Sequence, residues 1–174
     1  MVSKISFETL DLMDALDLAI LIEKEAEERY REFAKMVGSQ TDGDAGHFFE
    51  LMAGNEAKHG ADLCARRKQL FGAKPMRVTA RQIEDVEAPE YDKPRAFMSV
   101  RHALEVALAS EVKAQKFFEN ALKHITDKEV SAVFLELRDE EIDHQRLVKN
   151  QMEKTDPSLE PVRKKGEIDE PPGL

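Results

Sequence analysis

Two short motifs in this sequence pair a glutamate with a histidine three residues later: Glu56 with His59, and Glu141 with His144. On an α-helix, residues three apart lie on one face about one turn from each other, so both side chains of a pair would point the same way. Apolar residues flank each pair at helical spacing, which indicates that the pair faces the protein interior. Carboxylate oxygens and imidazole nitrogens together suit iron or manganese.

Two further glutamates, Glu23 and Glu111, each lie alone within an apolar helical stripe. The first stripe consists of Leu16, Ala19, Ile20, Ala26 and Tyr30, and the second of Leu104, Ala107, Leu108, Ala114 and Phe118. A carboxylate on a buried face is costly unless another group pairs with it. We therefore expect Glu23 and Glu111 to share one interior site with the two Glu-x-x-His motifs.

Four carboxylates and two imidazoles at one interior point would repel each other, and some carboxylates would take up protons. Two divalent cations remove this conflict, and one glutamate from each of two helices plus Glu-x-x-His from the other two is a recurring di-metal arrangement in helix bundles. The predicted ligands of two iron ions, for which manganese or zinc could substitute, are Glu23, Glu56, His59, Glu111, Glu141 and His144. The alternative is a metal-poor helical interaction module with buried Glu–His hydrogen bonds.

The elements that would position these residues are four long segments with helical periodicity. They run from about residue 11 to 37, 41 to 71, 94 to 124 and 126 to 154. Gly38 and Gly72 follow the first two as stop signals, and Thr126 with Glu129 has the spacing of a capping box at the start of the fourth. Short connections join the helices of each pair, whereas residues 72–93 form a connection long enough to cross the bundle. The predicted fold is all-α, an antiparallel four-helix bundle with a long crossover between helices 2 and 3.

The two predicted helix pairs also resemble each other. Aligning Glu23 with Glu111 pairs Leu16 with Leu104 and Tyr30 with Phe118, and aligning Glu56 with Glu141 pairs Phe49 with Phe134, Met52 with Leu137 and Leu63 with Val148. Such an internal repeat predicts a pseudo-two-fold fold. A two-fold axis would naturally pass through a two-metal site.

Composition limits the other possibilities. The net charge of −9 disfavours nucleic-acid binding, and the longest apolar run near the N-terminus, residues 18–22, is too short for a membrane span. The single cysteine, Cys64, excludes an intrachain disulfide and favours a cytoplasmic protein; its place on helix two suggests a buried thiol. We expect residues 1–155 to form the bundle, and the Pro-rich, charged residues 156–174 to be an extended or disordered tail.

Four stretches carry a resemblance to a known family. Residues 23–30 (EKEAEERY), 56–59 (EAKH), 111–114 (EVKA) and 140–144 (EEIDH) are similar to the rubrerythrin branch of the ferritin-like superfamily. The resemblance covers about residues 11–154 and implies a di-iron bundle, often homodimeric, that reduces hydrogen peroxide or oxidises Fe(II). By this resemblance the six residues named above are the iron ligands, with Glu56 and Glu141 able to bridge.

The sequence departs from that family in two respects. It lacks the cysteine-rich rubredoxin module, so electrons would come from an external donor protein or a small reductant. Ala114 stands where peroxidase-type members have an extra glutamate, which makes the site more similar to the six-ligand centre of ferritin-type ferroxidases. We predict an oxidoreductase acting on hydrogen peroxide or oxygen; the alternative is a ferroxidase or iron-handling protein without a dedicated reductase.

Three residues are candidates for contacts behind the ligands. Tyr30 is positioned to donate a hydrogen bond to a ligand carboxylate, whereas its repeat partner Phe118 has no donor, so the two metals would be inequivalent. Asn55 and Glu140 precede the two motif glutamates, and each is a candidate to orient a histidine on a neighbouring helix.

Overall fold

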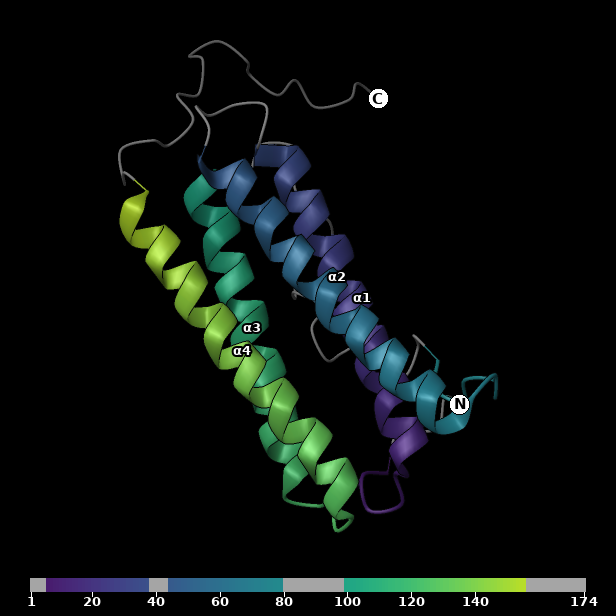
Figure 1. The fold of residues 1–174 in the computed structure, drawn as a ribbon. Helices are drawn as coiled ribbons and strands as arrows, with labels where there is room; N and C mark the ends of the chain where they lie inside the picture. Colours follow the sequence, from purple (N-terminus) through teal and green to yellow (C-terminus); the bar gives the residue numbers. More distant parts are fainter. Residues whose placement is uncertain (1–5, 38–43, 80–98, 156–174) are drawn as a thin grey trace, which may run out of the picture.

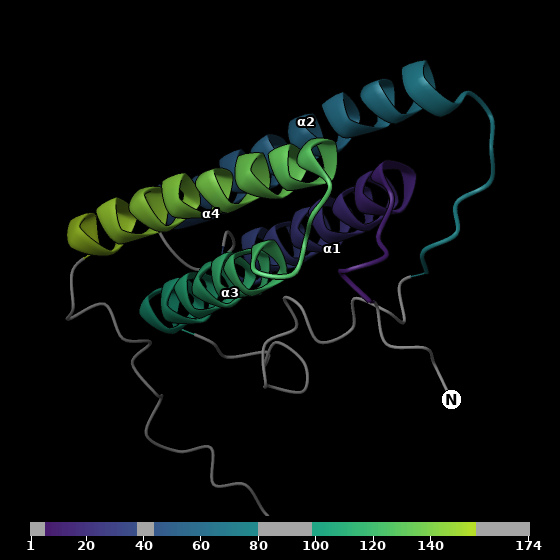
Figure 2. The same ribbon diagram turned by 90° about the horizontal axis from the view of Figure 1, so that it is seen from below.

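The computed structural model describes residues 6–37, 44–79 and 99–155, which contain four long α-helices and no strand. The helices are α1 (Leu12–Val37), α2 (Asp44–Phe71), α3 (Val100–Leu122) and α4 (Lys128–Lys154). Figure 1 shows α1 with α2 and α3 with α4 as two antiparallel hairpins that lie side by side. Seen from below, α2 and α4 form one layer and α1 and α3 the other (Figure 2). The predicted all-α bundle is confirmed.

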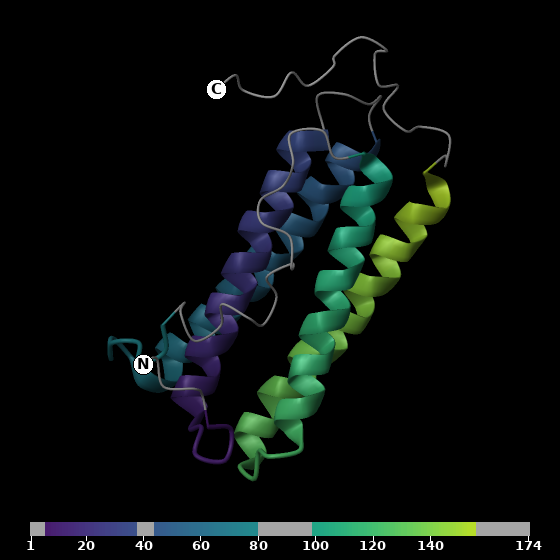
Figure 3. The same cartoon turned by 180° about the vertical axis from the view of Figure 1, so that it is seen from behind.

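The direction of the helices requires the predicted crossover. Helix α2 ends at the lower end of the bundle, and α3 begins at the upper end (Figures 1 and 3). The chain must therefore return along the length of the bundle between these two helices. Gly72 follows the last residue of α2 with a φ of 62°, a left-handed conformation that glycine adopts without steric cost.

Two helix starts differ from the sequence prediction. Helix α3 begins at Val100 rather than near residue 94, because Ser99 is extended and its side chain accepts a hydrogen bond from the His102 backbone at 3.1 Å. The predicted capping box at Thr126 is wrong. Asp127 is the N-cap of α4, and its carboxylate accepts hydrogen bonds from the backbone N–H groups of the second and third helical residues, at 2.8 and 3.0 Å.

The core consists of two apolar clusters, one toward each end of the bundle, with the six predicted ligands between them along the helices. The lower cluster includes Leu16, Leu63, Phe118, Phe134 and Leu137, and the upper cluster includes Tyr30, Phe49, Met52, Leu104 and Val148. Each repeat pair named from the sequence has one member in each cluster. The two helix pairs are therefore related by a pseudo-two-fold axis that exchanges the ends of the bundle, as the sequence predicts.

A buried ion pair fastens the lower end of the first hairpin. Asp17 of α1 is fully buried, and Arg67 of α2 donates to both oxygens of its carboxylate. The backbone N–H of Arg77 donates to the same carboxylate at 3.1 Å, and the Arg77 side chain reaches Asp11 and Asp14. These contacts hold the segment after α2 against the start of α1.

Several predictions fall on residues outside the described part of the chain. They are the stop at Gly38, the exact path of the crossover through residues 80–98, and the tail at residues 156–174. Among the helices that are described, none combines the length and the low polarity that crossing a lipid bilayer requires.

Candidate metal centre

All four helices direct acidic or imidazole side chains at the middle of the bundle. They are Glu23 from α1, Glu56 and His59 from α2, Glu111 from α3, and Glu141 and His144 from α4. Five of them are buried, and His59 is the exception, with 24% of its side chain exposed. The Glu-x-x-His spacing aligns each pair on the inward face because three residues are close to one helical turn.

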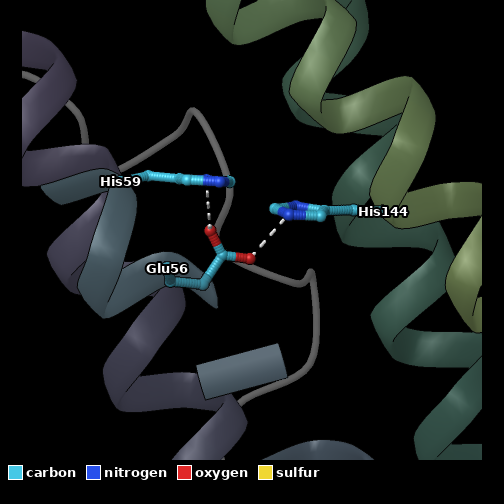
Figure 4. Close-up of side chains that lie close together, drawn as sticks. All are labelled: Glu56, His59 and His144. Carbon is cyan, nitrogen blue, oxygen red and sulfur yellow. Dashed lines mark ion pairs between the residues drawn. The ribbon is translucent and has the colours of Figure 1, made fainter. Parts of the chain in front are cut away.

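The carboxylate of Glu56 lies between the two histidines. Its oxygens are 3.9 Å from Nδ1 of His59 and 3.1 Å from Nδ1 of His144 (Figure 4). The two imidazole rings reach inward from α2 and α4 and stack nearly parallel, with centroids 5.4 Å apart and an angle of 9° between the planes. One carboxylate therefore lies between the imidazoles of both hairpins.

Each histidine also faces a carboxylate on the other helix of its own hairpin. His59 Nδ1 is 3.8 Å from Glu23 Oε2, and His144 Nδ1 is 3.5 Å from Glu111 Oε2. Two half-sites result. The open half contains Glu23, His59 and Glu140, and the closed half contains Glu111, Glu141 and His144; within each, the three candidate ligand atoms lie within 4.8 Å of one another.

Several of these atoms are buried with no hydrogen-bond partner. Glu23 Oε2, His59 Nδ1 and His144 Nδ1 are in this condition, although each is close to another polar group. Burying a polar atom without a partner costs free energy, and native proteins rarely do so. Cations between these atoms would satisfy them, and a mixed oxygen and nitrogen donor set is one that iron accepts. The residues present therefore fit a two-iron centre.

The pKa values of the metal-free side chains reflect the same crowding. Burial raises the pKa of Glu23 from 4.5 to about 7, despite its contact with Glu56. Burial and the neighbouring His144 lower the pKa of His59. Burial would also lower the pKa of His144, but the Glu111 carboxylate beside it outweighs that effect and raises it. Without cations the charged forms of these groups are thus unevenly stabilised.

Tyr30 donates a buried hydrogen bond to Glu111 Oε1, across the bundle from its own helix. Burial would raise the pKa of Glu111, but contacts with His144, Glu141 and Tyr30 outweigh it and lower the pKa. Tyr30 was predicted to donate a hydrogen bond to a carboxylate of the site, and its acceptor is Glu111 on α3 rather than Glu23 on its own helix. Its repeat partner Phe118 is fully buried in the lower cluster and has no donor to offer.

The other two candidates for supporting contacts are Glu140 and Asn55. Glu140 Oε2 is 3.8 Å from His59 Nδ1, on the neighbouring helix, and the Glu140 side chain is 36% exposed. Asn55 is half-buried on α2, and its role stays a prediction.

Sequence reasoning missed one residue and misplaced another. Gln145 is buried beside His144 and donates to the Glu111 backbone carbonyl at 3.4 Å and to the Gln115 side chain at 2.7 Å, which ties α4 to α3. Its only signal in the sequence is its place next to a motif histidine. Cys64 was predicted to be buried, but it is exposed. The buried residues on this part of α2 are Leu63 and Arg67.

The fold and this arrangement of carboxylates and histidines define a ferritin-like four-helix bundle with a candidate two-metal centre. The family model described as Rubrerythrin matches residues 14–93 and 102–172, so the chain belongs to the rubrerythrin family of di-iron carboxylate proteins. A crystal structure of an uncharacterized conserved protein from Magnetospirillum magnetotacticum MS-1 is similar, with 27% identity and a TM-score of 0.70. The match covers 84% of this chain and 97% of that one. No curated protein matches the chain.

Proposed function

We propose that this chain is an oxidoreductase that holds two iron ions and reduces hydrogen peroxide to water. The observation that carries the proposal is the convergence of carboxylate and imidazole side chains from all four helices on the middle of the bundle. Three of their atoms, Glu23 Oε2 on α1, His59 Nδ1 on α2 and His144 Nδ1 on α4, are buried without a hydrogen bond within the described protein. The ligands would be the six residues Glu23, Glu56, His59, Glu111, Glu141 and His144, and Glu56 lies near the histidines of both half-sites.

Peroxide reduction consumes two electrons and two protons and releases two water molecules as the O–O bond breaks. When bound, a pair of Fe(II) ions supplies the two electrons, one from each ion. The chain's own side chains bind and orient the ions, and the apolar clusters above and below the site limit the access of water along the bundle axis. Tyr30 holds Glu111 in a fixed position through its hydrogen bond.

Among the described residues, a surface cleft reaches the open half-site. A cleft of about 130 Å³ lies between α2 and α4, and its lining includes His59 and Glu140. A molecule the size of hydrogen peroxide or oxygen is small enough to reach the open half-site this way. The chain contains one cysteine, so a rubredoxin-type centre within these 174 residues is excluded, and a separate protein is the proposed electron donor. A cytoplasmic homodimer is the proposed form.

A second candidate function is iron oxidation or iron handling. The observation that favours it is Ala114, which is fully buried in the lower apolar cluster and places no carboxylate at that position of α3. In that case oxygen, rather than peroxide, would be the preferred oxidant, and the oxidised iron would leave the site.

Anaerobic loading with Fe(II) tests the proposal. We expect two irons per chain, and faster oxidation of the loaded protein by peroxide than by oxygen in stopped-flow absorbance measurements. Glu56→Gln should lose the two-iron stoichiometry, whereas Glu50→Gln, a matched change at an exposed position on the same helix, should keep it. Faster oxidation by oxygen with release of ferric iron would favour iron handling, and fewer than two irons per chain would refute both.

A further inference from the structure

The open half-site contains a carboxylate that lies outside the six proposed ligands. Glu140 on α4 places Oε2 at 3.8 Å from His59 Nδ1, the same distance that separates His59 Nδ1 from Glu23 Oε2. All three atoms lie within 4.8 Å of one another. We propose that Glu140 is a seventh metal ligand, which binds the cation held by Glu23 and His59.

The distances suit a single ion between the three atoms. Bonds from a transition metal to carboxylate oxygen and imidazole nitrogen are roughly 2.0–2.2 Å, so two ligands of one ion are about 2.9 Å apart when adjacent and about 4.4 Å when opposite. The two separations of 3.8 Å fall inside that interval. Small side-chain rotations would bring Glu140 and Glu23 into the coordination shell of an ion bound to His59.

A second observation points to a cation at this position. Glu23 is only 3% exposed, and its Oε2 atom has no hydrogen-bond partner. The Nδ1 atom of His59 is also buried and also lacks a hydrogen bond, although 24% of the His59 side chain is exposed. A cation among the three atoms would satisfy both and would also offset the negative charges of the two carboxylates, which a neutral water molecule does not do.

The internal repeat shows that the extra carboxylate belongs to one half-site alone. Glu140 aligns with Asn55, because each directly precedes a motif glutamate. An amide is a weak and neutral ligand compared with a carboxylate, so the closed half-site gains no matching negative charge. The closed half has instead the hydroxyl of Tyr30 on Glu111, and the open half has a phenylalanine at that repeat position.

Glu140 also lies where an entering cation would first meet the site. It lines the α2–α4 cleft together with Asp62 and Glu136, so three of the charged side chains of the cleft are acidic. The fourth, Arg66, is paired with Glu136 at 2.9 Å. The Glu140 side chain is 36% exposed, whereas that of Glu23 behind it is 4% exposed. A partly exposed carboxylate can turn between solvent and the interior, and this suits a ligand that joins the ion late or leaves it first.

This inference rests on the proposed two-iron site, and metal binding tests it independently of activity. Metal-free wild-type protein and Glu140→Gln are titrated anaerobically with Fe(II) in a calorimeter, and ⁵⁷Fe-loaded samples are compared by Mössbauer spectroscopy. Loss of one coordinating carboxylate should weaken one of the two binding steps by about tenfold or more and leave the other unchanged. Only one of the two iron signals in the spectrum should shift.

The matched control is Asp139→Asn, which removes the same charge from an exposed neighbour that pairs with Arg138 on the surface. It should bind both irons as the wild type does. Equal affinities in Glu140→Gln and wild type, or equal weakening of both steps, would overturn the inference. Failure of the wild type to react with peroxide would refute the proposed activity but would leave the binding comparison intact.

Discussion

Replacing Glu23 with glutamine should stabilise the metal-free protein at alkaline pH. Burial raises the pKa of the Glu23 carboxyl from 4.5 to about 7 in the folded, metal-free chain. The folded state therefore holds a proton that the unfolded state has already released between these pH values. The contribution of the Glu23 carboxyl to the free energy of unfolding is fully present below pH 4.5, and it is lost as the pH rises through about 7.

The size of the effect follows from the two pKa values. Each pKa unit corresponds to about 1.36 kcal/mol, so the difference between 4.5 and about 7 corresponds to about 3 kcal/mol of unfolding free energy. Between pH 5 and pH 8, the wild type should lose about 2.5 kcal/mol of this stabilisation. Glutamine resembles the protonated acid and does not titrate. Glu23→Gln should therefore lack this loss and unfold at higher urea concentration than the wild type at pH 8.

The assay is urea unfolding followed by circular dichroism, in chelator, at pH 5 and pH 8. Glu28→Gln is the matched control, because Glu28 is 67% exposed on the same helix and pairs loosely with Lys24, so the change should stay within about 0.5 kcal/mol at both pH values. Equal pH dependence in wild type and Glu23→Gln would refute the reasoning, since it would mean that the Glu23 carboxylate is solvated or paired in the metal-free fold.

Glu111 provides a test of opposite sign in the same assay. Its pKa is lowered because contacts with His144, Glu141 and Tyr30 outweigh the effect of burial. A carboxylate whose pKa is lowered by folding stabilises the folded protein at pH values above its ordinary pKa. This stabilisation is lost as the pH falls through the pKa of the folded state. Glu111→Gln should therefore destabilise the metal-free protein at pH 8, whereas Glu23→Gln should stabilise it. Stabilisation by both variants would contradict the opposite pKa shifts of the two glutamates.

Three other changes have defined outcomes. Tyr30→Phe removes the buried hydrogen bond to Glu111 and should cost about 1.5–3 kcal/mol in metal-free urea unfolding at pH 8; no loss would show that the bond is dispensable. Asp127→Ala removes the N-cap of α4 and should cost about 1 kcal/mol, measured by thermal unfolding, with iron stoichiometry unchanged. Arg67→Ala leaves the fully buried Asp17 without its cation and should cost about 3–5 kcal/mol, most of which the double variant Asp17→Leu/Arg67→Met should recover.

The fold was predictable because each helix carries its buried face in its own sequence. Apolar residues at helical spacing around Glu23 and Glu111 identified the inward faces of α1 and α3, and both glutamates are buried there. The long connection after Gly72 predicted the crossover because a short one cannot join two helices that begin at the same end. Local sequence was sufficient for these features, because the spacing of apolar residues determines the buried face of a helix and the length of a connection determines which helix ends it can join.

Features that depend on contacts between helices were less predictable. Tyr30 was identified as a donor, but its acceptor on α3 depends on how the two hairpins pack. The burial of Asp17 with Arg67 had no signal, because single charges on a helix are usually exposed and the pairing joins residues 50 apart. Thr126 and Asp127 are both good N-cap residues, so sequence alone could not choose between them.

The internal repeat has a consequence for how the two halves of the site can differ. Repeat partners occupy opposite core clusters, so the repeat by itself gives both half-sites the same surroundings. A difference between the half-sites can therefore arise where repeat partners differ in residue type, as they do at the following two positions. Tyr30, paired with Phe118, provides a hydroxyl to the closed half, and Glu140, paired with Asn55, provides a carboxylate to the open half. The closed half contains a buried hydrogen bond, whereas the open half faces the cleft with a partly exposed acid. In the proposed two-metal centre, the open half would therefore be the one where ligands exchange.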